Sequence, residues 1–152
     1  MLLTELLSLE RVRIPLRART KEELLHELVE AVSQGLPEAA ADSILAAVRD
    51  REQVLSTGIG QGVAIPHGKT PVVDQLLMAA GVTAAPVDFD ALDGEPVELC
   101  FVLVGPESAA GAHVKALSRI SRLLRRASLR DALRAAPTAH EFLRLVRESE
   151  AA

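Results

Sequence analysis

The sequence predicts an α/β fold in which one mixed β-sheet is covered by helices. Three observations predict it: β-rich segments alternate with helical segments, the longest apolar run (97–104) has the composition of a buried strand, and two capping boxes mark helix starts. Neither an internal repeat nor a low-complexity linker interrupts this pattern. We therefore expect residues 1–152 to form a single domain.

Local signals define the elements of the first part of the chain. Residues 11–16 alternate polar and apolar side chains and contain Pro15, which cannot donate a hydrogen bond to a neighbouring strand, so we expect an edge strand. The capping box at 20–23 opens a helix that ends at Gly35. A second helix is expected at about 37–51.

The middle of the chain changes character. We expect a glycine-rich loop at 56–62, an apolar, strand-like segment at 63–65, and then the sequence Pro66-His67-Gly68. The later elements are strands at 76–84 and 97–104, separated by an extended piece at 87–89 and a turn at 92–95, and helices at 109–126, at 128–134 and from 138 onward. In such sheets, sites form beyond the strand ends, where loops and helix N-termini meet.

Composition narrows the class of protein. With 17 Lys and Arg against 21 Asp and Glu, and no Trp or Tyr, the chain lacks the basic surface and stacking aromatics of nucleic-acid binders. No apolar stretch approaches the length that spans a bilayer, and the N-terminus lacks the basic region of a signal peptide. The single cysteine, Cys100, excludes an intramolecular disulfide. We expect a cytoplasmic protein with no nucleic-acid partner and no membrane insertion.

His67 is the first candidate for chemistry. It follows a strand-like segment and lies between Pro66, which restricts the backbone before it, and Gly68, which leaves space after it. An imidazole held in this way at a strand end suits a group that accepts a phosphoryl moiety from a partner protein. The alternative is a histidine that caps the loop through a backbone hydrogen bond, and this fragment alone leaves both possibilities open.

The glycines at 58–62 do not form a nucleotide-binding fingerprint. The G-x-G-x-x-G pattern needs glycine at position 63, which is Val63, and a helix directly after it, where Pro66 intervenes. The P-loop pattern also fails, because the required Gly-Lys-Ser/Thr is missing. What remains is a phosphate-adjacent loop in which backbone N–H groups around Gly60 and Gly62 approach an anion. A plain tight turn is the alternative.

Two further polar residues fall near strand ends. His113 lies near the start of the helix after the central strand, on its apolar face, where the positive helix N-terminus favours a neutral ring that donates one hydrogen bond. Arg51 ends a helix just before the glycine-rich segment, and its guanidinium offers a rigid set of donors to phosphate. The alternatives are a half-buried, hydrogen-bonded histidine and an arginine that interacts with its own helix dipole.

The run Ser-Thr-Gly-Ile-Gly-Gln-Gly-Val-Ala-Ile-Pro-His-Gly at 56–68 resembles the enzyme IIA family of the bacterial phosphoenolpyruvate:sugar phosphotransferase system. The similarity is to the fructose/mannitol class, which includes the nitrogen-type IIA proteins. It continues through 87–97 and the histidine that follows Gly105-Pro106, and it covers essentially the whole chain. The resemblance implies a mixed sheet of about five strands with helices on both faces.

The same resemblance implies the roles of three site residues. His67 corresponds to the phosphorylated histidine, with Nε2 as the acceptor atom. His113 corresponds to the second active-site histidine, and Arg51 to the arginine beside the site, where it stabilises the phosphoryl group. Phosphoryl transfer between protein nucleophiles needs positioning and charge stabilisation, and we expect neither a cofactor nor a metal.

The resemblance also implies partners. The donor would be the phosphohistidine of the carrier protein HPr or of its nitrogen-type paralogue, and the acceptor a IIB domain with a nucleophilic cysteine. The alternative is a nitrogen-type regulatory protein, which controls its partners by its phosphorylation state without sugar transport. A third hypothesis is a metal-dependent hydrolase that uses His67, His113 and an acid such as Asp88 or Asp93. This hypothesis is weaker than the other two, because no motif with the spacing of metal ligands supports it.

Overall fold

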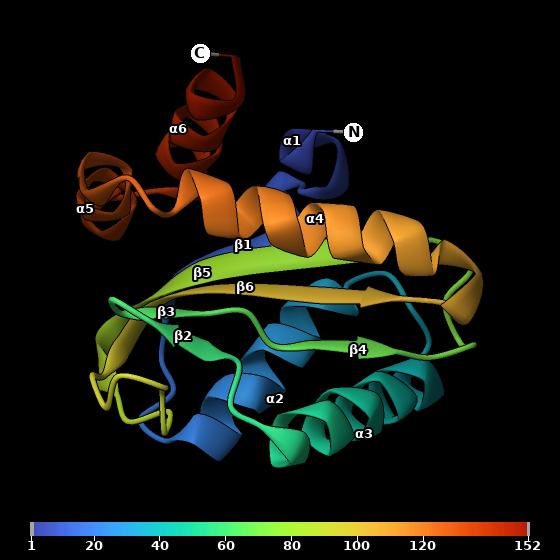
Figure 1. The fold of residues 1–152 in the computed structure, drawn as a ribbon. Coiled ribbons are helices and arrows are strands. Elements are labelled where there is room, and N and C mark those ends of the chain that lie inside the picture. Colours follow the sequence, from blue (N-terminus) through green and yellow to red (C-terminus); the bar gives the residue numbers. More distant parts are fainter. Residues whose placement is uncertain (1, 152) are drawn as a thin grey trace.

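In the computed structural model, which describes residues 2–151, one mixed β-sheet lies between two groups of helices (Figure 1). The strands are β1 (Val12–Leu16), β2 (Gly58–Gly60), β3 (Val63–Ala64), β4 (His67–Lys69), β5 (Leu77–Val87) and β6 (Val97–Gly105). The helices are α1 (Leu3–Leu6), α2 (Lys21–Val32), α3 (Glu38–Val54), α4 (Ala110–Leu123), α5 (Ala127–Ala135) and α6 (Ala139–Ala151), with 3₁₀ turns η1 (Leu9–Arg11) and η2 (Glu107–Ala109).

The sheet has the order β1-β5-β6-β3-β2, and β4 also pairs with β6. β5 and β6 are antiparallel, whereas β3 and β4 both run parallel to β6. Val63 lies opposite Leu99 and His67 lies opposite Leu103, which is the same offset, so β3 and β4 are two halves of one interrupted strand. Counted in this way the sheet has five positions, with β1 at one edge. The mixed sheet of about five strands and the edge strand β1 are therefore confirmed.

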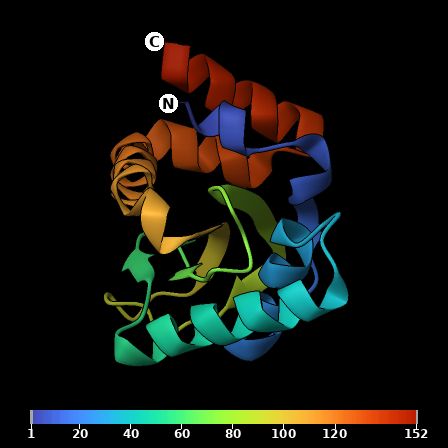
Figure 2. The same ribbon diagram turned by 90° about the vertical axis from the view of Figure 1, so that its right-hand side faces the viewer.

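Two hydrophobic cores lie on opposite faces of the sheet, because successive side chains of a strand point to opposite faces. In β5, Met78 and Ala80 belong to one core, and Leu77 and Ala79 belong to the other. Helices α2 and α3 cover one face, and α1, α4, α5 and α6 cover the other, as predicted (Figures 1 and 2). Figure 1 shows β4 between α3 and α4, so side chains from all three elements can converge there.

Both predicted capping boxes open helices. The hydroxyl oxygens of Thr20 and Thr138 accept hydrogen bonds from the backbone N–H groups of Glu23 and Glu141, each at 3.2 Å. The return bond of the first box differs from the usual pattern, because the Glu23 carboxylate accepts from the N–H of Arg19 at 3.0 Å. Within residues 2–151, none of the helices combines the length and the apolar character that crossing a membrane requires.

The structure corrects the prediction for the glycine-rich segment. Residues 56–62 do not form a continuous loop, because Gly58–Gly60 is strand β2, antiparallel to β3. The turn is confined to Gln61 and Gly62, whose φ angles of 60° and 80° lie in the left-handed region. Helix α3 also continues past Arg51 to Val54, which leaves only a short connection between α3 and β2.

The two ends of the chain are joined through Glu150 of α6. Its carboxylate accepts hydrogen bonds from the backbone N–H groups of Leu3 and Thr4 at 2.7 and 3.1 Å, and from Nε of Arg119 at 2.7 Å. The Glu150 side chain is only 2% exposed, and these donors balance its charge. Figure 1 shows both termini on the side of α4 that is turned away from β4.

Candidate functional site

His67 is the first residue of β4 and is half-buried beside the interruption of the strand. Its Nδ1 lies 2.8 Å from the carbonyl oxygen of Ile65. A carbonyl oxygen can only accept a hydrogen bond, so we assign the ring proton to Nδ1, and Nε2 keeps a lone pair. Pro66 lies between Ile65 and His67 in the chain, and its carbonyl oxygen accepts a hydrogen bond from the N–H of Leu103 at 3.0 Å. This bond holds the segment between β3 and β4 against β6. Nδ1 thus makes the hydrogen bond to the backbone that was expected of a loop-capping histidine, whereas Nε2 is available as a nucleophile.

His113 lies near the N-terminal end of α4, as predicted. It is 1% exposed, its ring centroid is 5.5 Å from that of His67, and the two ring planes are inclined at 67°. Neither ring nitrogen of His113 has a hydrogen-bond partner among the described residues. An unpartnered buried polar group is costly, so this ring is suited to a ligand atom that arrives beside His67.

Arg51 lies near the C-terminal end of α3 and lines the same pocket as the two histidines. Its Nη1 donates to the carbonyl oxygen of Leu55 at 2.9 Å, which is the helix-end interaction expected from the alternative interpretation. Helix α3 comes close to β4 because Gly68 has no side chain: a Cβ at this position would lie 2.9 Å from the carbonyl carbon of Ala47. Gly68 therefore allows α3, and with it Arg51, to lie beside His67.

A pocket of about 400 Å³ joins these side chains. It is lined by Ala47, Arg51, His67, Gly68, Lys69, His113, Val114 and Leu117. Lys69 directly follows the family motif and adds a second cation that the sequence pattern did not indicate. Val114, which is 63% exposed, is a further lining residue without a sequence signal and forms an apolar part of the rim. Within residues 2–151, no three or more His, Cys, Asp or Glu side chains form a group that could hold a metal ion.

Burial keeps both imidazoles of the pocket in their neutral form. It lowers the pKa of His67 below its ordinary value, and the positive charges of Arg51 and Lys69 act in the same direction. Burial also lowers the pKa of His113 to about 4, again with help from nearby positive charge. At neutral pH the pocket therefore contains two uncharged rings and two cations, an arrangement that favours a bound dianion.

Comparison with known proteins identifies the family. A family model described as "Phosphoenolpyruvate-dependent sugar phosphotransferase system, EIIA 2" matches residues 5–149. The chain belongs to this family. The resemblance of the sequence to IIA proteins is thereby confirmed, and residues 5–149 form a IIA-type domain.

Several relatives of this IIA protein match over most of its length. The nitrogen regulatory protein of Pseudomonas aeruginosa is 40% identical over 144 residues, which cover 95% of this chain and 94% of the relative. The fructose-specific EIIABC component of Bacillus subtilis is 33% identical over 150 residues, which cover 99% of this chain and 24% of that larger protein.

Solved structures of other IIA proteins have the same fold. The nitrogen regulatory protein IIA-Ntr of Neisseria meningitidis matches with a TM-score of 0.86 at 34% identity, over 95% of this chain and 98% of that one. The mannitol IIA of Escherichia coli, solved in complex with phosphorylated IIB, matches with a TM-score of 0.76 at 20% identity, over 93% and 97% of the two chains. The second comparison shows the fold alone.

The structure of this IIA protein does not bring Gly60 and Gly62 into the pocket. Both lie at the tip of the β2–β3 hairpin, where the N–H of Gln61 donates to the Asp93 carboxylate at 2.9 Å. The carbonyl oxygen of Gln61 accepts from Nη2 of Arg134 at 2.6 Å. These contacts give the turn partners within the protein, and the expectation of a phosphate-adjacent loop at these glycines stays a prediction.

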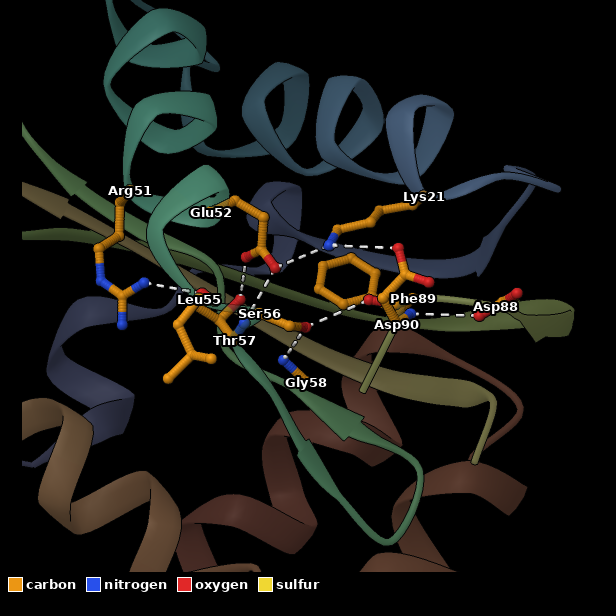
Figure 3. A network of polar contacts seen from close by, with 10 residues as sticks. All are labelled: Lys21, Arg51, Glu52, Leu55, Ser56, Thr57, Gly58, Asp88, Phe89 and Asp90. Atoms are coloured by element: carbon orange, nitrogen blue, oxygen red, sulfur yellow. Dashed lines mark hydrogen bonds and ion pairs between the residues drawn. The ribbon is translucent and has the colours of Figure 1, made fainter. Parts of the chain in front are cut away.

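Glu52 is a buried residue beside the site that sequence analysis missed. Its side chain is 4% exposed and lies between Lys21 and the backbone of Thr57 (Figure 3). Glu52 follows the buried residues Ile44 and Val48 at intervals of four, so it occupies the apolar face of α3. An acid on the apolar face of a helix is rarely buried without partners. The position of Glu52 on this face was therefore a sequence signal that its carboxylate has partners in the fold.

The low pKa of His113 leads us to expect a loss of stability of this IIA protein in mild acid. The unfolded chain binds a proton at this histidine near pH 6.5, whereas the folded protein binds it only near a pKa of about 4. Between these values the unfolded state holds more protons, so the free energy of unfolding falls as the pH is lowered from about 6.5 to about 4. We expect His113 to account for about 2–3 kcal/mol of this loss.

Urea denaturation of the wild type and of His113→Gln at pH 7.5 and pH 4.5 measures this effect. Glutamine does not titrate, so the free energy of unfolding of the variant should fall by about 2 kcal/mol less than that of the wild type over this range. An equal fall in the two proteins would show that the His113 ring is not held neutral by the fold.

Proposed function

We propose that this IIA protein is a phosphocarrier that accepts a phosphoryl group on Nε2 of His67 and delivers it to a partner protein. One observation carries the proposal: Nδ1 is bonded to the Ile65 carbonyl at 2.8 Å, so the ring lone pair belongs to Nε2, in a pocket shared with His113 and two cations. The donor is the phosphohistidine of HPr or of its nitrogen-type paralogue. The protein acts in the cytoplasm, with residues 1–152 as one domain.

The transfer requires no net proton movement if each ring keeps its N–H. The Nε2 lone pair of His67 attacks the phosphorus of the donor phosphohistidine, and a new N–P bond forms while the N–P bond of the donor breaks. The electron pair of the broken bond returns to the donor imidazole. His67 keeps its proton on Nδ1, bonded to Ile65, while Nε2 carries the phosphoryl group.

We assign the stabilisation of the phosphoryl oxygens to three side chains. The neutral ring of His113 has one N–H to donate, and this bond would supply the partner that the buried ring lacks in the unphosphorylated protein. Arg51 and Lys69 add positive charge beside the three oxygens. Such positioning and charge stabilisation account for most of the catalysis of phosphoryl transfer.

The acceptor belongs to one of two classes. Full-length similarity to the nitrogen regulatory protein of Pseudomonas aeruginosa supports a regulatory role, in which a phosphate of about −1.5 to −2 charge decides which partner binds. The similarity to the fructose-specific EIIABC component of Bacillus subtilis instead supports transfer to a IIB domain, whose cysteine is the acceptor that the family resemblance implies. Because the regulatory relative shares 40% of its residues and covers nearly the whole chain, we favour the regulatory role.

Incubation with phosphorylated HPr tests the proposal. We expect about one equivalent of acid-labile, base-stable phosphate per chain, and mass spectrometry should locate it on the peptide that contains His67. Absence of label, or label on another residue, would refute the proposal. Addition of a fructose-type IIB domain then separates the two acceptor classes, because a transport component loses its label to the IIB cysteine and a purely regulatory protein retains it.

A further inference from the structure

A buried carboxylate connects helix α3 to the segment that precedes His67. One oxygen of Glu52, Oε2, accepts from the backbone N–H of Thr57 at 2.9 Å, and the other, Oε1, accepts from the Thr57 hydroxyl. Figure 3 shows this pair of bonds at the point where α3 gives way to β2. Glu52 therefore fixes both the backbone and the side chain of Thr57.

Thr57 is in turn bonded to the backbone that holds the His67 ring. The carbonyl oxygen of Thr57 accepts from the N–H of Ile65 at 3.0 Å, and the carbonyl oxygen of Ile65 accepts from Nδ1 of His67 at 2.8 Å. A continuous series of hydrogen bonds thus runs from the Glu52 carboxylate to the imidazole. Any shift of Thr57 changes where the Ile65 carbonyl points, and this carbonyl decides which ring nitrogen carries the proton.

Lys21 balances the buried charge of Glu52. Its Nζ lies 3.0 Å from Oε2 of Glu52 and 4.7 Å from the centroid of the Phe89 ring, and the exposed carboxylate of Asp90 lies at 4.0 Å. The buried carboxylate thus has the hydrogen bonds and the neighbouring cation that a buried charge requires. None of these groups lines the pocket of His67.

We propose that Glu52 is a positioning residue for His67: through Thr57 and Ile65 it holds the imidazole in the Nδ1–H tautomer, so that Nε2 is the nucleophile. The kinetic part of this inference rests on the proposed function of His67. The tautomeric part concerns the unphosphorylated protein and stands independently of it.

The tautomer is measured directly by the ¹⁵N chemical shifts of the His67 ring at pH 8, where the ring is neutral. The wild type should show mainly the Nδ1–H form. Glu52→Ala removes both bonds to Thr57, so we expect a substantial rise of the Nε2–H form. Glu52→Gln should restore most of the wild-type ratio, because its amide oxygen can still accept from the N–H of Thr57.

Phosphoryl uptake from phosphorylated HPr provides the second measurement. Misplacement of the nucleophile by a fraction of an ångström should slow uptake by Glu52→Ala about 10- to 100-fold, with partial recovery in Glu52→Gln. Asp50→Ala is the matched control, since Asp50 is an exposed acid on the same helix and is expected to leave both the tautomer ratio and the uptake rate unchanged.

Thr57→Val keeps the experiment decisive if Glu52→Ala does not fold. Valine removes only the hydroxyl bond to Glu52 and keeps the backbone N–H bond, so a smaller change of the tautomer ratio is expected, and Thr57→Ser should reverse it. A folded Glu52→Ala or Thr57→Val variant with the wild-type tautomer ratio would overturn the inference, even if its stability or uptake rate were lower. Failure of the wild type to take up phosphate would refute the proposed function but leave the tautomer measurement valid.

Discussion

We expect His67→Gln to fold normally and to take up no detectable phosphate from phosphorylated HPr. The glutamine amide can still donate to the Ile65 carbonyl, which now accepts from Nδ1, so the local backbone should be kept. The variant has no nucleophilic nitrogen, however, because the lone pair of an amide nitrogen is delocalised into its carbonyl. As His67 is only half-buried, the free energy of unfolding should change by no more than about 1 kcal/mol.

A gel assay that separates phosphorylated from unphosphorylated protein measures the loss, and thermal unfolding followed by circular dichroism checks the fold. His140→Gln is the control, since His140 is exposed at the start of α6. This variant should be phosphorylated like the wild type, and only at His67. Persistent labelling of His67→Gln would mean that another residue accepts the phosphoryl group.

The second large effect concerns the rate of transfer. His113→Ala should still be phosphorylated on His67 to the same final extent, but about 10²- to 10³-fold more slowly, because the variant loses the buried ring that we propose as a donor to the phosphoryl oxygens. His113→Gln keeps an N–H group at the same place and should recover part of the rate. Rapid-quench measurement of a single turnover separates the rate from the end point.

An unchanged single-turnover rate in His113→Ala would remove His113 from the mechanism and leave stabilisation to Arg51 and Lys69. A lower final extent of labelling would instead indicate that the phosphorylated state itself has become less stable. Thermal unfolding must accompany the kinetics, since truncation of a fully buried ring creates a cavity and costs stability.

The sequence could predict the site residues whose signals are local. Pro66 and Gly68 flank His67, and the apolar periodicity of α4 places His113 on its inner face, so both could be assigned before their contacts were known. The structure brings them within 5.5 Å between ring centroids, beside Arg51. For His67 the local pattern left phosphoryl acceptance and loop capping both open, and the family resemblance favoured acceptance.

Other features depend on contacts between distant parts of the chain and could not be derived in this way. The β4 strand exists because His67 pairs opposite Leu103, and no local pattern in a three-residue strand indicates such pairing. The contact between Gln61 and Asp93 joins distant parts of the chain, so the glycine pattern alone could not separate an anion-binding loop from a plain tight turn. Glu52 has a local signal, its place on the apolar face of α3, but its cation, Lys21, belongs to another helix and could not be paired with it from the sequence.

The bonds between Glu150 and the first turn of α1 have a practical consequence for work on this protein. Leu3 and Thr4 lie beside the end of α6, and Figure 1 shows this region across α4 from β4, the strand that contributes His67 to the pocket. A fluorescent reporter or affinity tag fused at either terminus will therefore extend from the face opposite His67 and leave the pocket open to a docking protein. A C-terminal truncation must retain Glu150. Without its carboxylate, two backbone N–H groups and the Arg119 guanidinium lose the hydrogen-bond acceptor that they share.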